Sequence, residues 1–232
     1  MIKTVILDLD DTLYDYQGGN RLGIAALKKY CREHFRMEED VFQEKMEEAW
    51  LTVSDRMGTA RASVHNRLIR YQCFLESIHE PVFLHARKMY HTYWDTLLDH
   101  MKLNEGAGEW MRQLRNQGIQ VGMATNMTAY IQYRKVERLG IGPLLDWIVT
   151  SEEVGVEKPD PRIFRVCVEK SGVSSGECLF VGDNLKGDIE GAMRAGMNAM
   201  LYDPGFHVKE KEGLPYRVIH SFRECLAEDF CL

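Results

Sequence analysis

The sequence predicts an α/β fold in which a parallel sheet is interrupted, after its first strand, by an inserted bundle of helices. Val5, Ile6 and Leu7 form an apolar run with little alternation, which is typical of a strand buried on both faces of a parallel sheet. Residues 20–101 then carry helical periodicity, and from Asn104 onward helical patterns alternate with short apolar runs. The first strand therefore lies before the bundle, and the other strands follow it.

The insertion is predicted to contain four amphipathic helices, because its apolar residues recur at spacings of three and four. The four sets are Ile24, Leu27, Cys31 and Phe35; Phe42, Met46, Ala49, Trp50, Val53 and Met57; Val64, Leu68, Tyr71, Leu75 and Ile78; and Phe83, Ala86, Tyr90, Tyr93, Trp94 and Leu97. Turn or helix-start residues separate them at 57–59 and 80–81. Such helices with short connections form an antiparallel bundle, which we expect to cover the end of the first strand as a cap.

The rest of the chain is predicted to alternate between helices and strands. The predicted helices span residues 107–116, 128–139, 161–170, 189–195 and 221–228. The predicted strands span residues 119–124, 147–150, 178–181, 199–202 and 217–219. Gly118 and Gly140 mark helix ends, while Asp160 and Pro161 are suited to the N-cap and first position of a helix. This alternation implies right-handed βαβ units and a parallel sheet.

The composition is that of an ordinary globular protein with a sizeable core. Of its 232 residues, 45% are hydrophobic and 28% are charged, and the formal net charge is −6. The acidic balance, without a Lys/Arg block, disfavours a nucleic acid or an anionic membrane as partner. No apolar run approaches the roughly 18 residues of a membrane span, and we expect no signal peptide before the first strand.

Cysteine and histidine usage indicates a reducing compartment and no zinc site. The cysteines are Cys31, Cys73, Cys167, Cys178, Cys225 and Cys231. They are scattered, without a C-x-x-C pair, and the eight histidines lack the spacing of metal ligands. We therefore expect buried or incidental thiols in a cytoplasmic protein.

Polar residues follow three of the predicted strands. They are Asp8 and Asp10, then Thr125 and Asn126, then Asp183. Because the carboxyl ends of parallel strands meet at one edge of a sheet, we expect these side chains to lie close together. Lys158, just before a helix start, and Asp188, at another, are expected near the same edge.

This set of residues is suited to binding a metal and a phosphoryl group. Asp8, Asp10 and Asp183 offer hard oxygen ligands without histidine or cysteine, which suits Mg²⁺ rather than zinc. Lys158, the Thr125 hydroxyl and the backbone N–H groups after Asn126 are predicted to hold phosphate oxygens. The predicted site thus has places for a metal, a phosphoryl group and a carboxylate nucleophile.

Four segments at these positions match the motifs of a known family in order. They are Asp8-Leu9-Asp10-Asp11-Thr12, Thr125-Asn126, Lys158-Pro159-Asp160-Pro161-Arg162-Ile163-Phe164, and Gly182-Asp183-Asn184-Leu185-Lys186-Gly187-Asp188. Through them the chain resembles the haloacid dehalogenase-like (HAD) hydrolase superfamily. The resemblance implies a Rossmann-like core of residues 1–14 and 102–232, with the C1 helical cap of subfamily I at residues 15–101.

The resemblance also implies a mechanism with two catalytic aspartates. Asp8 attacks phosphorus in line and forms an aspartyl-phosphate. Asp10 protonates the leaving oxygen and then takes a proton from the hydrolytic water, while its backbone carbonyl ligates Mg²⁺. Many relatives carry glycine at the position of Asp11, to which we assign no catalytic role.

Further roles follow from the same resemblance. Lys158 neutralises charge on the phosphoryl group, and Asp183 is a direct Mg²⁺ ligand. Asp188 is a supporting acid that orients Lys158 or a metal-bound water. Thr12 has a structural role in the turn that presents Asp10.

The predicted function is Mg²⁺-dependent hydrolysis of a phosphomonoester on a small metabolite, either a nucleoside monophosphate or a sugar phosphate. The expected partner is that small molecule alone, with no nucleic acid or membrane, and the protein is expected to be a monomer or homodimer. A sugar-phosphate mutase is an alternative with the same chemistry. A 2-haloacid dehalogenase is a weaker one, because those enzymes lack an acid at the position of Asp10. A non-catalytic phosphate-binding protein is a third, disfavoured by the intact catalytic positions.

Substrate identity is expected to depend on the cap and the connection that leads into it. The candidate residues there are Tyr14, Tyr16, Arg56, Arg61, His65, Arg67 and Arg70. Arg67 and Arg70 are three residues apart and share a helix face. For most of these residues we expect a solvated bundle surface.

Overall fold

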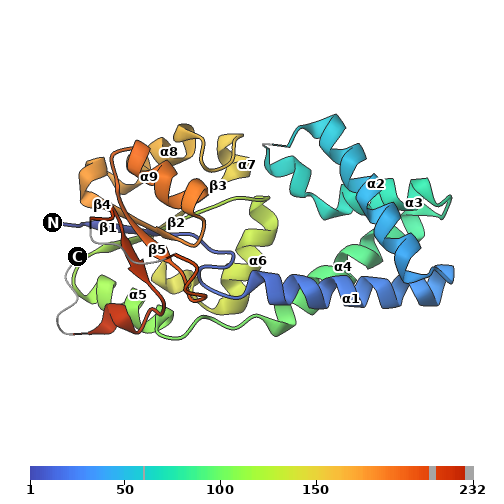
Figure 1. Ribbon diagram of the computed structural model, residues 1–232, viewed down its shortest axis with the longest axis horizontal. Coiled ribbons are helices and arrows are strands. Elements are labelled where there is room, and N and C mark those ends of the chain that lie inside the picture. Colours follow the sequence, from blue (N-terminus) through green and yellow to red (C-terminus); the bar gives the residue numbers. More distant parts are fainter. Residues whose placement is uncertain (60, 209–212, 228–232) are drawn as a thin grey trace. The chain divides into compact units, whose positions relative to one another are not determined.

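The computed structural model describes residues 1–59, 61–208 and 213–227, and it divides into two compact units. One unit comprises Met1–Asp15 and Lys102–Leu232, and the other comprises Tyr16–Met101. The first contains the sheet and the second is helical (Figure 1). The role of the helical unit as a cap stays a prediction.

Helices α1 (Tyr16–Phe35), α2 (Glu39–Met57), α3 (Arg67–Ser77) and α4 (Val82–His100) make up the helical unit, with a 3₁₀ turn at Ala62–His65. Helix α1 packs against α4, and α3 packs against both α2 and α4. Their facing side chains are buried, among them Leu27, Cys31, Phe42, Val53, Tyr71, Tyr93, Trp94 and Leu97. The apolar spacing in the sequence therefore located most of this interior.

Two residues predicted to lie on apolar faces do not. Leu68 is 39% exposed and Phe83 is fully exposed. Helix α3 begins at Arg67, and its buried face is formed by Tyr71, Phe74 and Leu75 on the later turns. The buried face of α4 likewise starts after Phe83. Both exceptions therefore lie in the first turn of a helix.

The sheet has six parallel strands in the order β3-β2-β1-β4-β5-β6. The strands are β1 (Thr4–Leu7), β2 (Gln120–Thr125), β3 (Trp147–Thr150), β4 (Cys178–Gly182), β5 (Asn198–Tyr202) and β6 (Arg217–Ile219). Every residue of β1 and β4 is buried, as expected of strands covered on both faces. The predicted α/β fold with a parallel sheet is confirmed.

Helices cover the two faces of this sheet. They are α5 (Ala107–Asn116), α6 (Ala129–Leu139), α7 (Ser151–Val154), α8 (Pro161–Ser171) and α9 (Glu190–Arg194). Helices α8 and α9 lie on one face and α5 on the other (Figure 1). Phe164 of α8 and Ile189, just before α9, belong to the same buried cluster as Ile6 and Phe180 of the sheet. This packing holds the central strands, whose carboxyl ends carry the polar residues.

Several element boundaries agree with the sequence prediction. The bounds of α5, β3 and β6 are those predicted, and Asp160 caps α8 by accepting the N–H of Arg162 at 2.9 Å. The segment 217–219 is only three residues long, and it forms strand β6 by pairing with β5. Short 3₁₀ turns at Gly142–Leu144 and Ser175–Glu177 lie between these elements.

One predicted helix is wrong in its extent, and both α7 and a π-helical turn were not predicted. The helix expected at 189–195 is preceded by a π-helical turn at Leu185–Ile189, where Asn184 Oδ1 accepts the N–H of Gly187 at 2.8 Å. The helix expected at 221–228 is only a 3₁₀ turn at Glu224–Leu226, and residue 228 lies outside the described residues. There the Glu224 carboxylate accepts the preceding N–H groups of His220 and Ser221.

The cysteines that the structure describes are buried free thiols: Cys31, Cys73, Cys167, Cys178 and Cys225. Cys231 lies outside the described residues. Within residues 1–59, 61–208 and 213–227, the helices fall short of the length and apolar character that a membrane span requires.

Candidate active site

The chain brings Asp8 and Asp183 together at the carboxyl edge of the sheet. Strands β1 and β4 are direct neighbours, with Leu7 opposite Val181. The backbone N–H of Asp8 donates to the carbonyl of Val181 at 2.9 Å, which extends the strand pairing by one residue. Since the strands are parallel, the residue that follows each one emerges at the same edge. The predicted convergence of these two acids is therefore observed.

Lys158 lies between two carboxylates at this edge. Its Nζ is 2.5 Å from Asp8 Oδ1 and 2.7 Å from Asp188 Oδ1, and it also donates to the carbonyl of Ala124 at 3.1 Å. The Lys158 side chain is only 5% exposed, so both ion pairs are buried. The Lys158 backbone N–H donates to Asn126 Oδ1 at 2.9 Å, and this bond holds the lysine's loop against the end of β2.

Asp8, Asp183 and Asp188 form a compact acidic cluster. One carboxylate oxygen from each lies within 4.8 Å of the others. Three carboxylates face one ammonium group here, so the cluster carries excess negative charge. Hard oxygen donors at this spacing fit a Mg²⁺ ion, which takes few protein ligands. The cluster differs from the predicted ligand set, because it contains the carboxylate of Asp188 and not that of Asp10.

Burial and neighbouring charges shift the acid–base properties of this cluster. Burial raises the pKa of Asp8; Lys158 opposes this increase, and Asp188 and Asp183 add to it. Burial, with the charges of Asp188 and Asp11, raises the pKa of Asp183 to about 6. Burial alone would lower the pKa of Lys158, but its two carboxylate partners raise it, so the ammonium stays charged. A divalent cation would favour the ionised carboxylates.

Thr12 and Gly182 shape the space around these acids. Thr12 Oγ1 lies 3.2 Å from Asp183 Oδ1 and 3.4 Å from Asp8 Oδ2, and it accepts the backbone N–H of Asp183 at 3.0 Å. At Gly182, a Cβ atom would lie 2.2 Å from Asp188 Oδ2, so no side chain fits there while Asp188 keeps its place. Thr12 therefore contacts Asp8 and Asp183, and Gly182 leaves the space that the Asp188 carboxylate occupies.

Asp10 has a different set of partners from Asp8. Lys135 Nζ contacts both Asp10 oxygens at 2.7 and 2.8 Å, and the Lys135 side chain is fully buried. Tyr14 OH donates to Asp10 Oδ1 at 2.5 Å, and Gln132 Nε2 donates to Asp10 Oδ2 at 3.1 Å. Lys135 and Gln132 were not predicted as site residues from the sequence. Their position on the buried face of a helix, beside Ile131, was the signal that could have identified them.

The residues predicted to hold phosphate already have protein partners. Thr125 is buried, and its hydroxyl accepts from Gln132 Nε2 at 2.5 Å. The Asn126 carboxamide binds the Lys158 loop. Of the backbone N–H groups after Asn126, that of Met127 donates to Ser151 Oγ at 2.9 Å and that of Ala129 to Glu152 at 2.8 Å. Thr125 and Asn126 thus support the site's framework in this structure.

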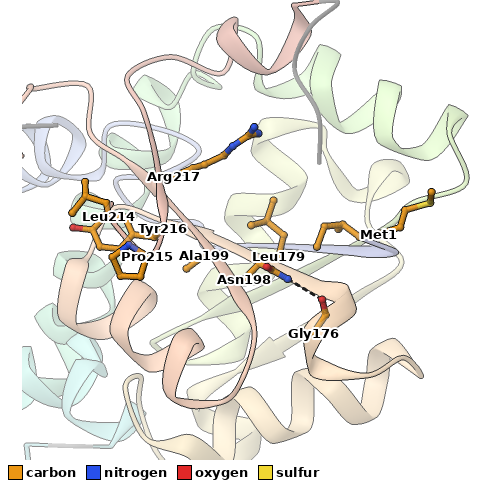
Figure 2. Close-up of a pocket in the computed structure, with 10 residues that line it drawn as sticks. Met1, Gly176, Leu179, Asn198, Ala199, Leu214, Pro215, Tyr216 and Arg217 are labelled. Carbon is orange, nitrogen blue, oxygen red and sulfur yellow. Dashed lines mark hydrogen bonds between the residues drawn. The ribbon is translucent and has the colours of Figure 1, made fainter. Parts of the chain in front are cut away.

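A separate cavity of about 500 Å³ lies at the opposite edge of the sheet (Figure 2). Its lining includes Met1, before β1, and Asn198 and Arg217, at the starts of β5 and β6. The acids and lysines described above do not line it. Ligands of parallel α/β sheets bind at the carboxyl ends of the strands, so the acidic cluster is the better candidate for the chemistry.

Comparison with known proteins identifies the family. The family model for haloacid dehalogenase-like hydrolases matches residues 2–196. The chain is 34% identical over 207 residues to a ribulose-1,5-bisphosphate 5-phosphatase of Halopiger xanaduensis, covering 88% of this chain and 86% of the relative. It is 34% identical to a glyceraldehyde 3-phosphate phosphatase of Methanopyrus kandleri, covering 85% and 82% respectively.

A solved structure shares the fold. The crystal structure of a 2-haloacid dehalogenase from Pseudomonas syringae pv. Tomato aligns over 97% of each chain with a TM-score of 0.79 and 24% sequence identity. At that identity the likeness is informative for the fold alone. Taken with the family match and the phosphatase relatives, it shows that this chain is a member of the haloacid dehalogenase-like hydrolase family and an enzyme of its phosphatase type.

Proposed function

We propose that this enzyme hydrolyses the phosphomonoester of a small sugar phosphate, with Asp8 as the nucleophile. The observation that carries the proposal is the contact of 2.5 Å between buried Lys158 Nζ and Asp8 Oδ1, next to Asp183 and Asp188. A carboxylate beside a fixed cation is suited to approach an anionic phosphoryl group, because the cation offsets their mutual repulsion.

In the first half-reaction, an Asp8 oxygen forms a bond to phosphorus as the bond from phosphorus to the sugar oxygen breaks. The sugar oxygen takes a proton from Asp10. In the second half-reaction, water attacks phosphorus, gives its proton to Asp10 and releases inorganic phosphate from Asp8. Lys135 and Tyr14 would position the Asp10 carboxylate between these steps, since both contact it directly.

A divalent cation fits the donor set of this site. Asp8, Asp183 and Asp188 provide closely spaced carboxylate oxygens, and the backbone carbonyl of Asp10 is a proposed additional ligand. A bound Mg²⁺ would supply positive charge that neutralises the phosphate oxygens. Lys158 would hold Asp8 in line and would itself be held by Asp188, at 2.7 Å.

The substrate class is inferred from the relatives. The two phosphatases at 34% identity act, by name, on ribulose 1,5-bisphosphate and glyceraldehyde 3-phosphate, which are both phosphorylated sugars. This favours a sugar phosphate over a nucleoside monophosphate.

The direct test is a phosphate-release screen of sugar phosphates and nucleoside monophosphates with purified protein. We expect turnover of at least one sugar phosphate with Mg²⁺, and loss of that turnover with excess EDTA that added Mg²⁺ reverses. Absence of turnover across the panel with Mg²⁺, or full turnover in EDTA, would contradict the proposal. Conversion to an isomeric sugar phosphate without release of phosphate would favour the mutase.

A further inference from the structure

Two arginines in the helical unit lie among aromatic rings in the first turn of α3. Arg67 and Arg70 are three residues apart, so they occupy one face of the helix. The solvated surface expected for most of the cap candidates does not describe these two, because each is partly buried and the Nε atom of each is fully buried. Both residues keep part of their surface exposed.

Arg67 is held in place by aromatic rings and neutral acceptors. Its Cζ lies 3.9 Å from the centre of the Tyr93 ring and 5.3 Å from that of Trp94. Its Nη2 donates to the Tyr16 hydroxyl at 2.9 Å and to Asn20 Oδ1 at 3.3 Å. Stacking of this kind fixes the plane of a guanidinium and leaves its edge available for hydrogen bonds.

Arg70 is less well satisfied than Arg67. Its Cζ lies 4.3 Å from the Trp50 ring centre, and its Nη2 makes one long hydrogen bond of 3.4 Å, to the carbonyl of Val64. The buried Nε atoms of both arginines are without a hydrogen-bond partner, and the buried Tyr71 hydroxyl has none of normal geometry. Buried polar groups are nearly always paired, so three such groups on one helix indicate a missing partner.

The charge of this arginine pair is also uncompensated. Among the described residues, no carboxylate lies within ion-pair distance of Arg67 or Arg70, and the acceptors they do contact are neutral. Burial and the positive charge of Arg67 lower the pKa of Arg70 to about 10. Two cations brought together without an anion are unfavourable unless a ligand supplies the negative charge.

We propose that Arg67 and Arg70 form a binding site for an oxyanion, a carboxylate or phosphate group, in the helical unit. Guanidinium groups match these anions because their N–H donors are planar and fixed. The oxyanion comes either from a second charged group of the phosphorylated substrate, in which case the inference rests on the proposed function, or from a separate small anion. The site itself needs only the arginine pair.

The decisive experiment follows the arginine Nε–Hε signals of the full chain by NMR during titration with inorganic phosphate. Arg67→Lys and Arg70→Lys variants assign the two signals. We expect both signals to shift saturably, while that of exposed Arg87 on α4 stays in place. Signals of Arg67 and Arg70 that do not move at any phosphate concentration that leaves the fold intact would overturn the proposal. This readout does not depend on catalytic activity, so a failed substrate screen leaves it valid.

Kinetics then identify the source of the anion. If it belongs to the substrate, Arg70→Gln raises KM for a sugar bisphosphate about tenfold, the size expected for one charge-assisted hydrogen bond, and leaves KM for the corresponding monophosphate unchanged. If it is a separate anion, malonate alters turnover of the monophosphate in the parent enzyme and not in Arg70→Gln. Arg87→Gln is the matched control and should behave as the parent in both assays. Equal effects of Arg70→Gln and Arg87→Gln in every assay would contradict a specific site.

Discussion

The ammonium group of Lys135 contacts both carboxylate oxygens of Asp10, at 2.7 and 2.8 Å, from a fully buried side chain. Asp8, only two residues earlier, pairs instead with Lys158 at 2.5 Å. Each of the two candidate catalytic acids therefore has its own lysine, from a different part of the chain. This arrangement keeps two neighbouring carboxylates in separate environments, as a nucleophile and a proton carrier require.

Replacing Lys135 should destabilise the fold because it leaves the Asp10 carboxylate without its cation. We expect Lys135→Met to lower the free energy of unfolding by about 3 kcal/mol, the lower range for a broken buried ion pair. Combining it with Asp10→Asn should cost less than the sum of the two single changes, since they remove the same interaction. Urea denaturation of the four proteins measures this coupling. If the losses of unfolding free energy were additive, Lys135 and Asp10 would not act as a pair. Lys88→Met changes an exposed lysine and is the control.

Gly182 should be intolerant of any side chain. In Gly182→Ala, the new Cβ would meet Asp188 Oδ2 at 2.2 Å, so Asp188 must move away from Lys158. We expect turnover to fall more than about tenfold, because Lys158 would no longer be held beside Asp8. Gly176→Ala is the matched control, since a Cβ there would meet no atom within 4 Å. Equal turnover rates in the two variants would contradict the proposed support of Lys158 by Asp188.

Lowering the pH should remove a contribution that Glu177 makes to the stability of the fold. Hydrogen bonds from Lys3 and Ser174 lower the pKa of this carboxyl to about 2 from its ordinary value of 4.5. A depressed pKa in the folded state stabilises the fold above the unfolded value, and that contribution is lost as the pH falls from about 4.5 towards 2. The parent should therefore melt at a higher temperature than Glu177→Gln at pH 7, with a gap that narrows over this acid range.

Thermal melts of both proteins across that range provide the measurement. Glu169→Gln changes an exposed carboxyl on α8 and should show no such pH-dependent gap. A gap for Glu177→Gln that is constant with pH would mean that its effect does not come from ionisation.

Local sequence patterns predicted much of the fold for a physical reason. The strand at Val5–Leu7 and the helix at 107–116 follow from the side chains of their own segments, and both occur in the structure. At 221–228 the local pattern indicated where a helical turn begins, since Glu224 accepts the N–H of Ser221 as at a helix start, but not that the turn ends at Leu226.

The convergence of Asp8 and Asp183 at the carboxyl edge of the sheet was also predictable, because the ends of strands can be located from the sequence. The partners of Asp10 were not, since Lys135 lies 125 residues away along the chain and its pairing depends on how α6 packs. Arg67 and Arg70 share this property: helical spacing placed them on one face, but only the packed helices show that the acceptors they contact among the described residues are neutral. Long-range pairing of charges is the part that the sequence alone did not determine.

A search for phosphate on Asp8 itself tests the proposed mechanism most sharply. Enzyme mixed with a turned-over substrate and Mg²⁺ is quenched in acid and digested, and its peptides are analysed by mass spectrometry. We expect a hydroxylamine-labile phosphoryl group on the peptide that contains Asp8, absent in a folded and inactive Asp8→Asn variant. Turnover by Asp8→Asn at the parent's rate, or a phosphoryl group found on another residue, would contradict it.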